Sequence, residues 1–156
     1  MPDIRDRVKE LRRVRAGDLK ADPRNWRLHP KPQRDALAGV LQEIGFADAL
    51  LVRESPEGLV IVDGHLRAGL DPNMEVPVMG LDLDEEEAAK LLVTLDPLAA
   101  MAQPDQDKLL ALLRDVHFDS QAVNAMLEAL ANGETQPMPT PGLTDPDDVP
   151  EVPTES

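Results

Sequence analysis

Cysteine is absent from this 156-residue chain, and aromatic residues nearly so. Without cysteine, the chain can form no disulfide framework, thiolate zinc site or cysteine nucleophile. One Trp, two Phe and no Tyr leave the core to aliphatic residues and methionine. The apolar fraction of 42% is still enough for one domain of ordinary size.

Long hydrophobic runs are also missing. No stretch approaches the roughly 18 consecutive apolar residues of a membrane span, and the opening "MPDIRDRVKE" lacks the apolar centre of a signal peptide. We therefore expect a cytoplasmic protein that has no membrane partner.

The charge is distributed unevenly along the chain. The net charge is −14. Residues 1–34 nevertheless hold 11 Lys or Arg against five Asp or Glu, whereas residues 35–156 hold five against 25. The first segment can meet phosphate groups, but the remainder would repel a nucleic-acid backbone. Non-specific DNA binding by the whole surface is therefore not expected.

The periodicity of apolar residues predicts an α+β fold, with a small mixed β-sheet and helices packed on it. Turn-forming "SPEG" between two apolar runs predicts a β-hairpin. We expect strands at Val8–Val14, Ala49–Arg53, Leu59–Asp63 and "VPVMGLDL", a helix of about three turns from Gln33, a short helix at "HLRAGL", and later helices at "DEEEAAKLLVTL", "PDQDKLLALLRDV" and "DSQAVNAMLEALANG". The loop "DPRNWRLHPKP", which ends at Pro32, is expected to be irregular because it holds three prolines.

These elements divide the chain into three parts. Residues 1–95 are expected to form the α+β domain, with its core from Val8 to Leu95, and residues 96–133 a helical extension. Residues 134–156 carry six prolines, six acidic residues and no Lys or Arg. Such a segment offers no apolar face, so we expect a disordered or partner-ordered tail that contributes nothing to folding.

The stretch "VIVDGHLRAG" is the first candidate for chemistry. An apolar strand ends at Asp63, Gly64 permits a turn, and His65 and Arg67 follow at the start of a short helix. Free backbone N–H groups at a helix start and an arginine fork together favour an anion, above all a phosphate. The ordinary alternative is a tight turn whose His65 and Arg67 are merely solvated.

The polar loop "RNWRLHPKPQ" is the second candidate. It gathers Asn25, Arg27, His29 and Gln33 on an irregular segment, where binding groups often concentrate. The alternative is a solvated basic loop anchored by its apolar residues. The histidines and Asp63 lack the close spacing of metal ligands, so no metal site is predicted.

The order of these motifs resembles the ParB/sulfiredoxin-like superfamily, especially the phage-type ParB-like "nuclease domain" proteins. The resemblance runs from about Leu11 to Leu95 and rests on "DPRNWRLH", a "Q...L...L.E.G" helix, "VDGHLRAGL" and "VPV...DL". It implies a ParB/sulfiredoxin-like fold. It also implies that the Gly64–Arg67 segment binds nucleotide phosphates and that the loop with Asn25, Arg27 and His29 lies beside it.

The sequence departs from two branches of that superfamily. Sulfiredoxins carry a catalytic Cys inside the Gly-x-x-Arg motif, where this chain has His65 and Leu66, so the resemblance does not extend to sulfinic-acid reduction. Chromosome-partitioning members have a second Arg in the motif and a following Ala, where this chain has Leu70. They also carry a helix-turn-helix module and a dimerisation domain, for which residues 96–133 leave little room.

Three functions remain open from the sequence. The first is a phage-type module that binds a nucleotide, such as a nucleoside triphosphate with Mg²⁺, or a nucleic-acid phosphate, as an accessory to phage or mobile-element DNA metabolism in the host cytoplasm. The second is a nuclease or phosphohydrolase in which Arg67 stabilises phosphate charge and His65 or His29 transfers protons. The third is a non-catalytic interaction protein whose acidic helices or tail bind a partner and whose phosphate site is vestigial. We expect Gly64, His65 and Arg67 to meet Asn25, Arg27 and His29 in one electropositive pocket. Gln33 is a further candidate for phosphate binding.

Overall fold

The chain folds into two compact units, described here from a computed structural model for residues 2–134. The first unit contains residues up to Asn25 together with Phe46–Ala102. The second contains Trp26–Gly45 together with the chain from Gln103 onward. The chain therefore leaves the first unit after Asn25 and returns to it at Phe46.

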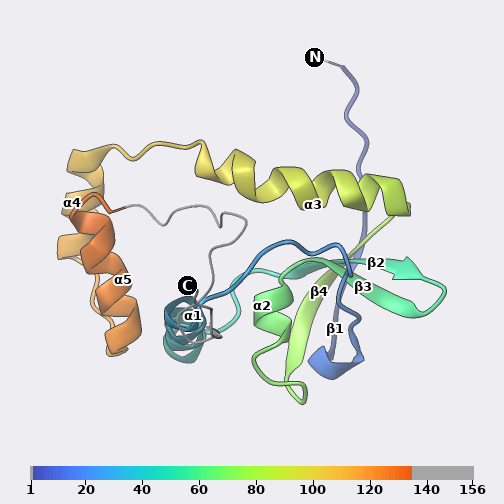
Figure 1. The fold of residues 1–156 in the computed structure, drawn as a ribbon, viewed down its shortest axis with the longest axis horizontal. Helices are drawn as coiled ribbons and strands as arrows, with labels where there is room; N and C mark the ends of the chain where they lie inside the picture. The colour runs from blue at the N-terminus through green and yellow to red at the C-terminus, as the bar shows by residue number, and fades with distance from the viewer. Residues whose placement is uncertain (1, 135–156) are drawn as a thin grey trace, which may run out of the picture. The chain divides into compact units, whose positions relative to one another are not determined.

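The first unit is built on a four-stranded mixed sheet in the order β1-β4-β2-β3 (Figure 1). Antiparallel pairs join β1 to β4 and β2 to β3, whereas β2 and β4 run parallel. The strands are β1 (Val8–Arg15), β2 (Leu50–Ser55), β3 (Gly58–Asp63) and β4 (Glu75–Leu81). Between β3 at one edge and the interior strand β4, the chain crosses over the sheet, and the short helix α2 (His65–Ala68) lies on this crossover.

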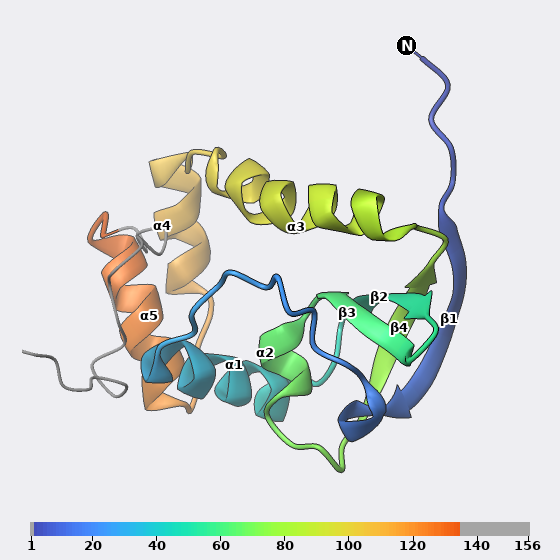
Figure 2. The ribbon, with the colours of Figure 1, turned by 45° about the vertical axis from the view of Figure 1, so that its right-hand side comes forward.

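The core of the first unit lies on one face of this sheet. Its buried members are aliphatic residues of β2, β3 and β4, joined by one alanine of the turn η1 (Ala16–Asp18) and one of α2. They are Ala16, Leu50, Val52, Ile61, Ala68, Val76 and Val78. Strand alternation turns Val60 and Val62 to the other face, and both are buried where α3 (Glu85–Ala100) contacts β3. Figure 2 shows α3 lying along the sheet.

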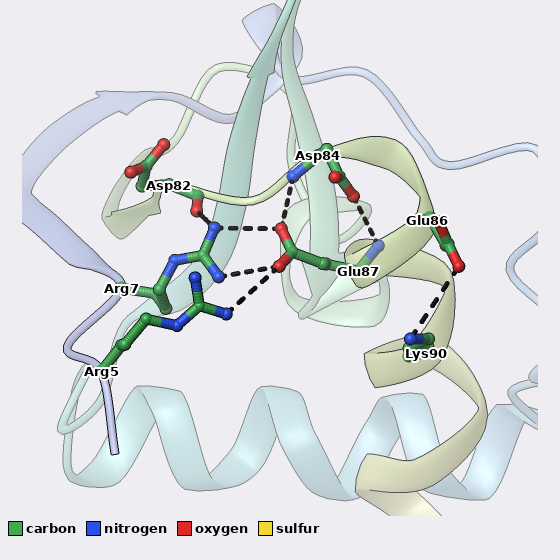
Figure 3. A network of polar contacts seen from close by, with 7 residues as sticks. All are labelled: Arg5, Arg7, Asp82, Asp84, Glu86, Glu87 and Lys90. Carbon is green, nitrogen blue, oxygen red and sulfur yellow. Dashed lines mark hydrogen bonds and ion pairs between the residues drawn. The ribbon is translucent and has the colours of Figure 1, made fainter. Parts of the chain in front are cut away.

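The N-terminal strand is fastened to the start of α3 by a charged cluster (Figure 3). The Arg7 guanidinium donates two hydrogen bonds to the Glu87 carboxylate, at 2.8 and 3.0 Å, and another to the Asp82 carbonyl. Asp84 and Glu87 form a capping box at the helix start. The Glu87 carboxylate binds Arg7, next to β1, and also belongs to the cap of α3. This one side chain therefore links β1 to α3.

The second unit contains three helices among its described residues: α1 (Lys31–Glu43), α4 (Gln106–Arg114) and α5 (Gln121–Ala131). Helices α1 and α5 approach closely at Gly39, where a Cβ atom would lie 2.4 Å from the Ser120 hydroxyl oxygen. The Glu43 carboxylate accepts hydrogen bonds from the backbone N–H groups of Asp119 and Ser120 at 2.9 and 3.0 Å. The end of α1 therefore caps the start of α5.

The observed elements confirm the predicted α+β fold and its mixed sheet. The expected hairpin is present, with Ser55 and Gly58 paired across its turn. Two boundaries were wrong. Helix α1 begins at Lys31 rather than after Pro32, because proline is tolerated in the first turn of a helix. Helix α3 continues through Pro97 to Ala100 and so extends past the expected end near Leu95.

The predicted domain boundaries and the predicted C-terminal tail both stay predictions. The domain boundaries at residues 95 and 133 stay a prediction, since each packed unit consists of two chain segments. The tail predicted for residues 134–156 lies, apart from Glu134, outside the described residues. Within the described part of the chain, no helix is long and apolar enough to cross a membrane.

The Arg7–Glu87 pair generates a pH-dependent prediction. Hydrogen bonds from Arg7, and then from the Asp84 backbone, lower the pKa of Glu87 from its usual 4.5 to about 2. A carboxylate with a lowered pKa stabilises the fold above its unfolded pKa, and that contribution disappears as the pH falls toward the folded value. We expect Glu87→Gln to lower the melting temperature at pH 7 and the difference from wild type to shrink between pH 4.5 and about 2.

Glu86→Gln is the matched control, because Glu86 is exposed and pairs only weakly with Lys90, at 3.9 Å. Its melting temperature should stay close to that of the wild type at every pH. Equal melting curves for Glu87→Gln and wild type at pH 7 would contradict a fastening role for this pair.

Candidate functional site

Gly64 forms the turn between β3 and α2. Its φ of +111° lies in the left-handed region that favours glycine. A Cβ atom at this position would lie 2.5 Å from Cγ of Leu50, which is fully buried in the core, and 3.0 Å from Nη2 of Arg67. Both the backbone angle and the lack of space therefore require glycine. The space on the Cβ side of Gly64 is filled by Leu50 of the core and by Arg67.

The Arg67 side chain folds back across this turn. Only 14% of it is exposed. Nη2 lies 3.4 Å from a carboxylate oxygen of Asp63, at the end of β3, and Nη1 donates a hydrogen bond to the carboxylate of Asp48. Asp48 lies on the segment that returns from the second unit to β2. The guanidinium that the sequence assigned to a phosphate thus already binds oxyanions, supplied by two carboxylates of the chain itself.

The His65 ring holds the start of the polar loop. Its Nε2 atom accepts a hydrogen bond of 3.1 Å from the backbone N–H of Asp22. An accepting Nε2 in a neutral imidazole leaves the proton on Nδ1. In this arrangement His65 acts as a positioning residue: it fixes the chain just before the loop leaves the first unit.

Asp22 in turn organises the first four residues of the loop. Its carboxylate accepts a hydrogen bond from the Arg24 backbone N–H at 2.8 Å, and its carbonyl accepts one from the Asn25 N–H at 3.0 Å. This is the Asx-capped turn expected of an Asp-Pro sequence. Lys20 extends the sheet beside β3 through an isolated bridge to Val60, which brings Asp22 next to α2. Asn25 is therefore placed on a defined turn in the same unit as His65.

The remaining predicted residues belong to the second unit. The Arg27 guanidinium lies 5.2 Å from the ring centre of Trp26, a cation–π distance. His29 Nδ1 and Gln33 Oε1 share a hydrogen bond of 3.0 Å, and the His29 carbonyl accepts another from Arg34. The structure thus brings His29 and Gln33 together at the start of α1.

The predicted residues consequently fall into two groups. Gly64, His65, Arg67 and Asn25 belong to the first unit, whereas Arg27, His29 and Gln33 belong to the second. Their union in a single electropositive pocket stays a prediction. Within residues 2–134, no group of three or more His, Asp or Glu is arranged to hold a metal ion. The helix expected at the motif is present, but α2 has only four residues.

Two residues at this site were missed from the sequence. Asp22 begins the loop motif, and the Asp-Pro-x-Asn pattern that it starts is a turn signal that could have indicated its structural role. Asp48 carried no such signal, because its contact with Arg67 spans 19 positions and depends on the tertiary fold.

Comparison with known proteins identifies the fold. A C-terminally truncated chromosome-partitioning protein ParB from Caulobacter crescentus, solved in complex with CTP-gamma-S, is similar over 66% of this chain and 61% of its own, with a TM-score of 0.53 and 23% sequence identity. The fold is ParB-like. A second similar structure, a Pnob8-like ParB-N domain, has a TM-score of 0.46 and 20% identity over 80% of this chain and 48% of its own. This chain spans about three-fifths of the length of the first structure and about half of the second.

No family model and no curated protein matches the sequence. The similarity to the Caulobacter crescentus ParB structure confirms the ParB part of the resemblance at the level of the fold. At 23% identity, this similarity identifies the fold of the chain but does not identify a ligand.

The crowding at Gly64 generates a stability prediction. In Gly64→Ala, the new Cβ must displace the buried Leu50 side chain and the backbone must keep a strained positive φ. We expect a loss of about 2–4 kcal/mol in the free energy of unfolding, the sum of overpacking and backbone strain. Urea unfolding followed by circular dichroism measures it.

Gly58→Ala is the matched control, because Gly58 has a φ of +124° but no atom within 4 Å of its would-be Cβ. Only backbone strain acts there, so the loss should be nearer about 1 kcal/mol. Equal losses in the two variants would show that packing against Leu50 does not matter.

The hydrogen bond between His65 and Asp22 generates a local prediction. In His65→Ala the Asp22 N–H loses its acceptor, and we expect faster hydrogen exchange at that amide with little change at amides of the sheet. Exchange measured by NMR at neutral pH tests this. The Ile61 N–H, which donates to the Lys20 carbonyl at 2.8 Å, is an internal reference that should keep its rate.

Proposed function

We propose that this ParB-like chain binds the phosphate groups of a nucleotide, with the Arg67 guanidinium as the principal contact. The observation that carries the proposal is the placement of Arg67. Its side chain is 86% covered, yet its Nη1 reaches the exposed carboxylate of Asp48. A guanidinium that binds a carboxylate oxygen at the rim of a fold has the donor geometry that a phosphate oxygen needs.

The surrounding residues support the same proposal. Gly64 has no side chain, which lets Arg67 lie across the turn in a fixed position. His65 holds the Asp22–Asn25 turn against α2, so Asn25 is a further polar group on the same unit. These placements preorganise the guanidinium, and preorganisation lowers the entropy lost on binding. The motif resemblance and a ParB structure complexed with CTP-gamma-S are consistent with a nucleoside triphosphate as the ligand.

The proposal also includes a biological role for the chain. The order of motifs is similar to that of phage-type ParB-like proteins, so we place this chain as an accessory factor in phage or mobile-element DNA metabolism. Mg²⁺ would accompany the triphosphate and partly neutralise its charge beside an acidic protein. A DNA phosphate would offer Arg67 the same oxyanion, and the acidic helices offer a surface for a protein partner.

The nuclease alternative is less well supported by the contacts at the motif. His65 uses Nε2 to hold the Asp22 backbone, and a ring nitrogen that accepts a structural hydrogen bond is not free to accept a proton from substrate. His29 is hydrogen-bonded to Gln33 in the second unit. No observation favours catalysis over binding.

Binding of the four common nucleoside triphosphates, measured by calorimetry with and without Mg²⁺, tests the proposal. We expect Arg67→Ala to weaken binding by about 1.5–3 kcal/mol, the value of a hydrogen bond to a charged group. Arg67→Lys should recover only part of this loss, because lysine keeps the charge but not the fork.

Arg15→Ala is the matched control, since Arg15 is an arginine of the same unit that pairs with an exposed aspartate at 3.1 Å. It removes the same charge away from the motif and should leave affinity nearly unchanged. Wild-type affinity in Arg67→Ala, or no binding of any triphosphate by the wild type and the variants, would overturn the proposed function.

A further inference from the structure

We propose that Asp48 is an internal competitor for the phosphate site, which a ligand phosphate must displace from Arg67. This inference rests on the proposed function and adds its regulation. In the unliganded chain the Asp48 carboxylate occupies the place on Nη1 that a phosphate oxygen takes in the complex. Binding is then an exchange of one oxyanion for another on a guanidinium that stays in place.

The two carboxylates on Arg67 differ in how firmly they are held. Asp63 ends β3, where its backbone pairs with Leu51 of β2, and it lies four residues before Arg67. Asp48 lies at a bend outside any strand or helix, and its side chain is 72% exposed against 43% for Asp63. The more exposed carboxylate keeps more of its hydration, so it gains less from pairing with Arg67 and is released at lower cost. Asp48 is therefore the carboxylate that leaves.

The charge balance also favours an exchange over a simple addition. Two carboxylates on one guanidinium leave a local charge of −1 at neutral pH, which repels an incoming phosphate. When Asp48 moves away, Arg67 and Asp63 form a neutral pair with free N–H donors on the Asp48 side. Asp63 then orients the fork, and the phosphate meets donors without the opposing carboxylate.

Within residues 2–134, Arg67 is the one partner recorded for the Asp48 side chain. Removing its charge therefore breaks no other contact of the fold. Asp48→Asn keeps the size of the side chain but binds the guanidinium more weakly, so the site is open more often. The variant separates competition from any structural role of the loop.

The experiment measures dissociation constants for a nucleoside triphosphate and for inorganic tripolyphosphate with the full chain, by calorimetry at low and high salt. We expect Asp48→Asn to bind both about three- to tenfold more tightly than the wild type at low salt, because a competing carboxylate and its repulsion of phosphate are removed. The gain should shrink at about 0.5 M salt, where exposed charges are screened.

Asp18→Asn is the matched control. Asp18 is an exposed aspartate, 68% accessible, paired with Arg15 at 3.1 Å in the same unit, so this variant changes the net charge equally and frees an arginine elsewhere. Its affinity should stay within about twofold of the wild type, as expected of a remote screened charge. An equal gain in Asp18→Asn would show a general charge effect and would overturn the competition.

The remaining outcomes separate this inference from the function on which it rests. Unchanged or weaker binding by Asp48→Asn, together with lost binding in Arg67→Ala, overturns the competitor and leaves the phosphate site standing. Wild-type binding in Arg67→Ala overturns the site and the competitor together.

Discussion

The left-handed turn at Gly64 is the constraint on which the candidate site depends. It reverses the chain at the end of β3, lets α2 start immediately, and leaves room for both Leu50 and the Arg67 guanidinium. The same glycine thus serves the core on one side and the charged side chain on the other. Because Leu50 cannot move without opening the core, the position of Arg67 is tied to the packing of the sheet.

The proposed binding of phosphate groups must overcome the negative charge of the whole chain. This chain carries a net charge of −14, so its average field opposes a phosphate. Local geometry outweighs that field only at short range, where a preorganised guanidinium meets the ligand. The two carboxylates around Arg67 more than offset its single positive charge in the free protein, and they pair a guanidinium that is mostly covered. In the proposed exchange they would also make binding selective, because only a ligand with more charge or more contacts than Asp48 would replace it.

Local patterns in the sequence predicted most of the fold. Alternating apolar residues indicated β1, and the "SPEG" turn between two apolar runs indicated the β2–β3 hairpin; both are present. Tertiary arrangement was harder to predict, because the parallel pairing of β2 with β4 and the division into two units depend on contacts distant in sequence. The same limit applied to the site. Gly64 and Arg67 share one motif and were found, whereas Asp48 reaches Arg67 only after folding.

The segment Trp26–Gly45 belongs to the second unit, and the chain on both sides of it is bound to side chains of α2. His65 holds Asp22 just before the chain leaves, and Arg67 holds Asp48 just after it returns. Leu50 is already held in the sheet by its pairing with β4, so releasing Asp48 frees only the few residues before Leu50. Chain entropy therefore contributes little to the exchange at Arg67, and its balance is set by charge and by the number of hydrogen bonds each oxyanion makes.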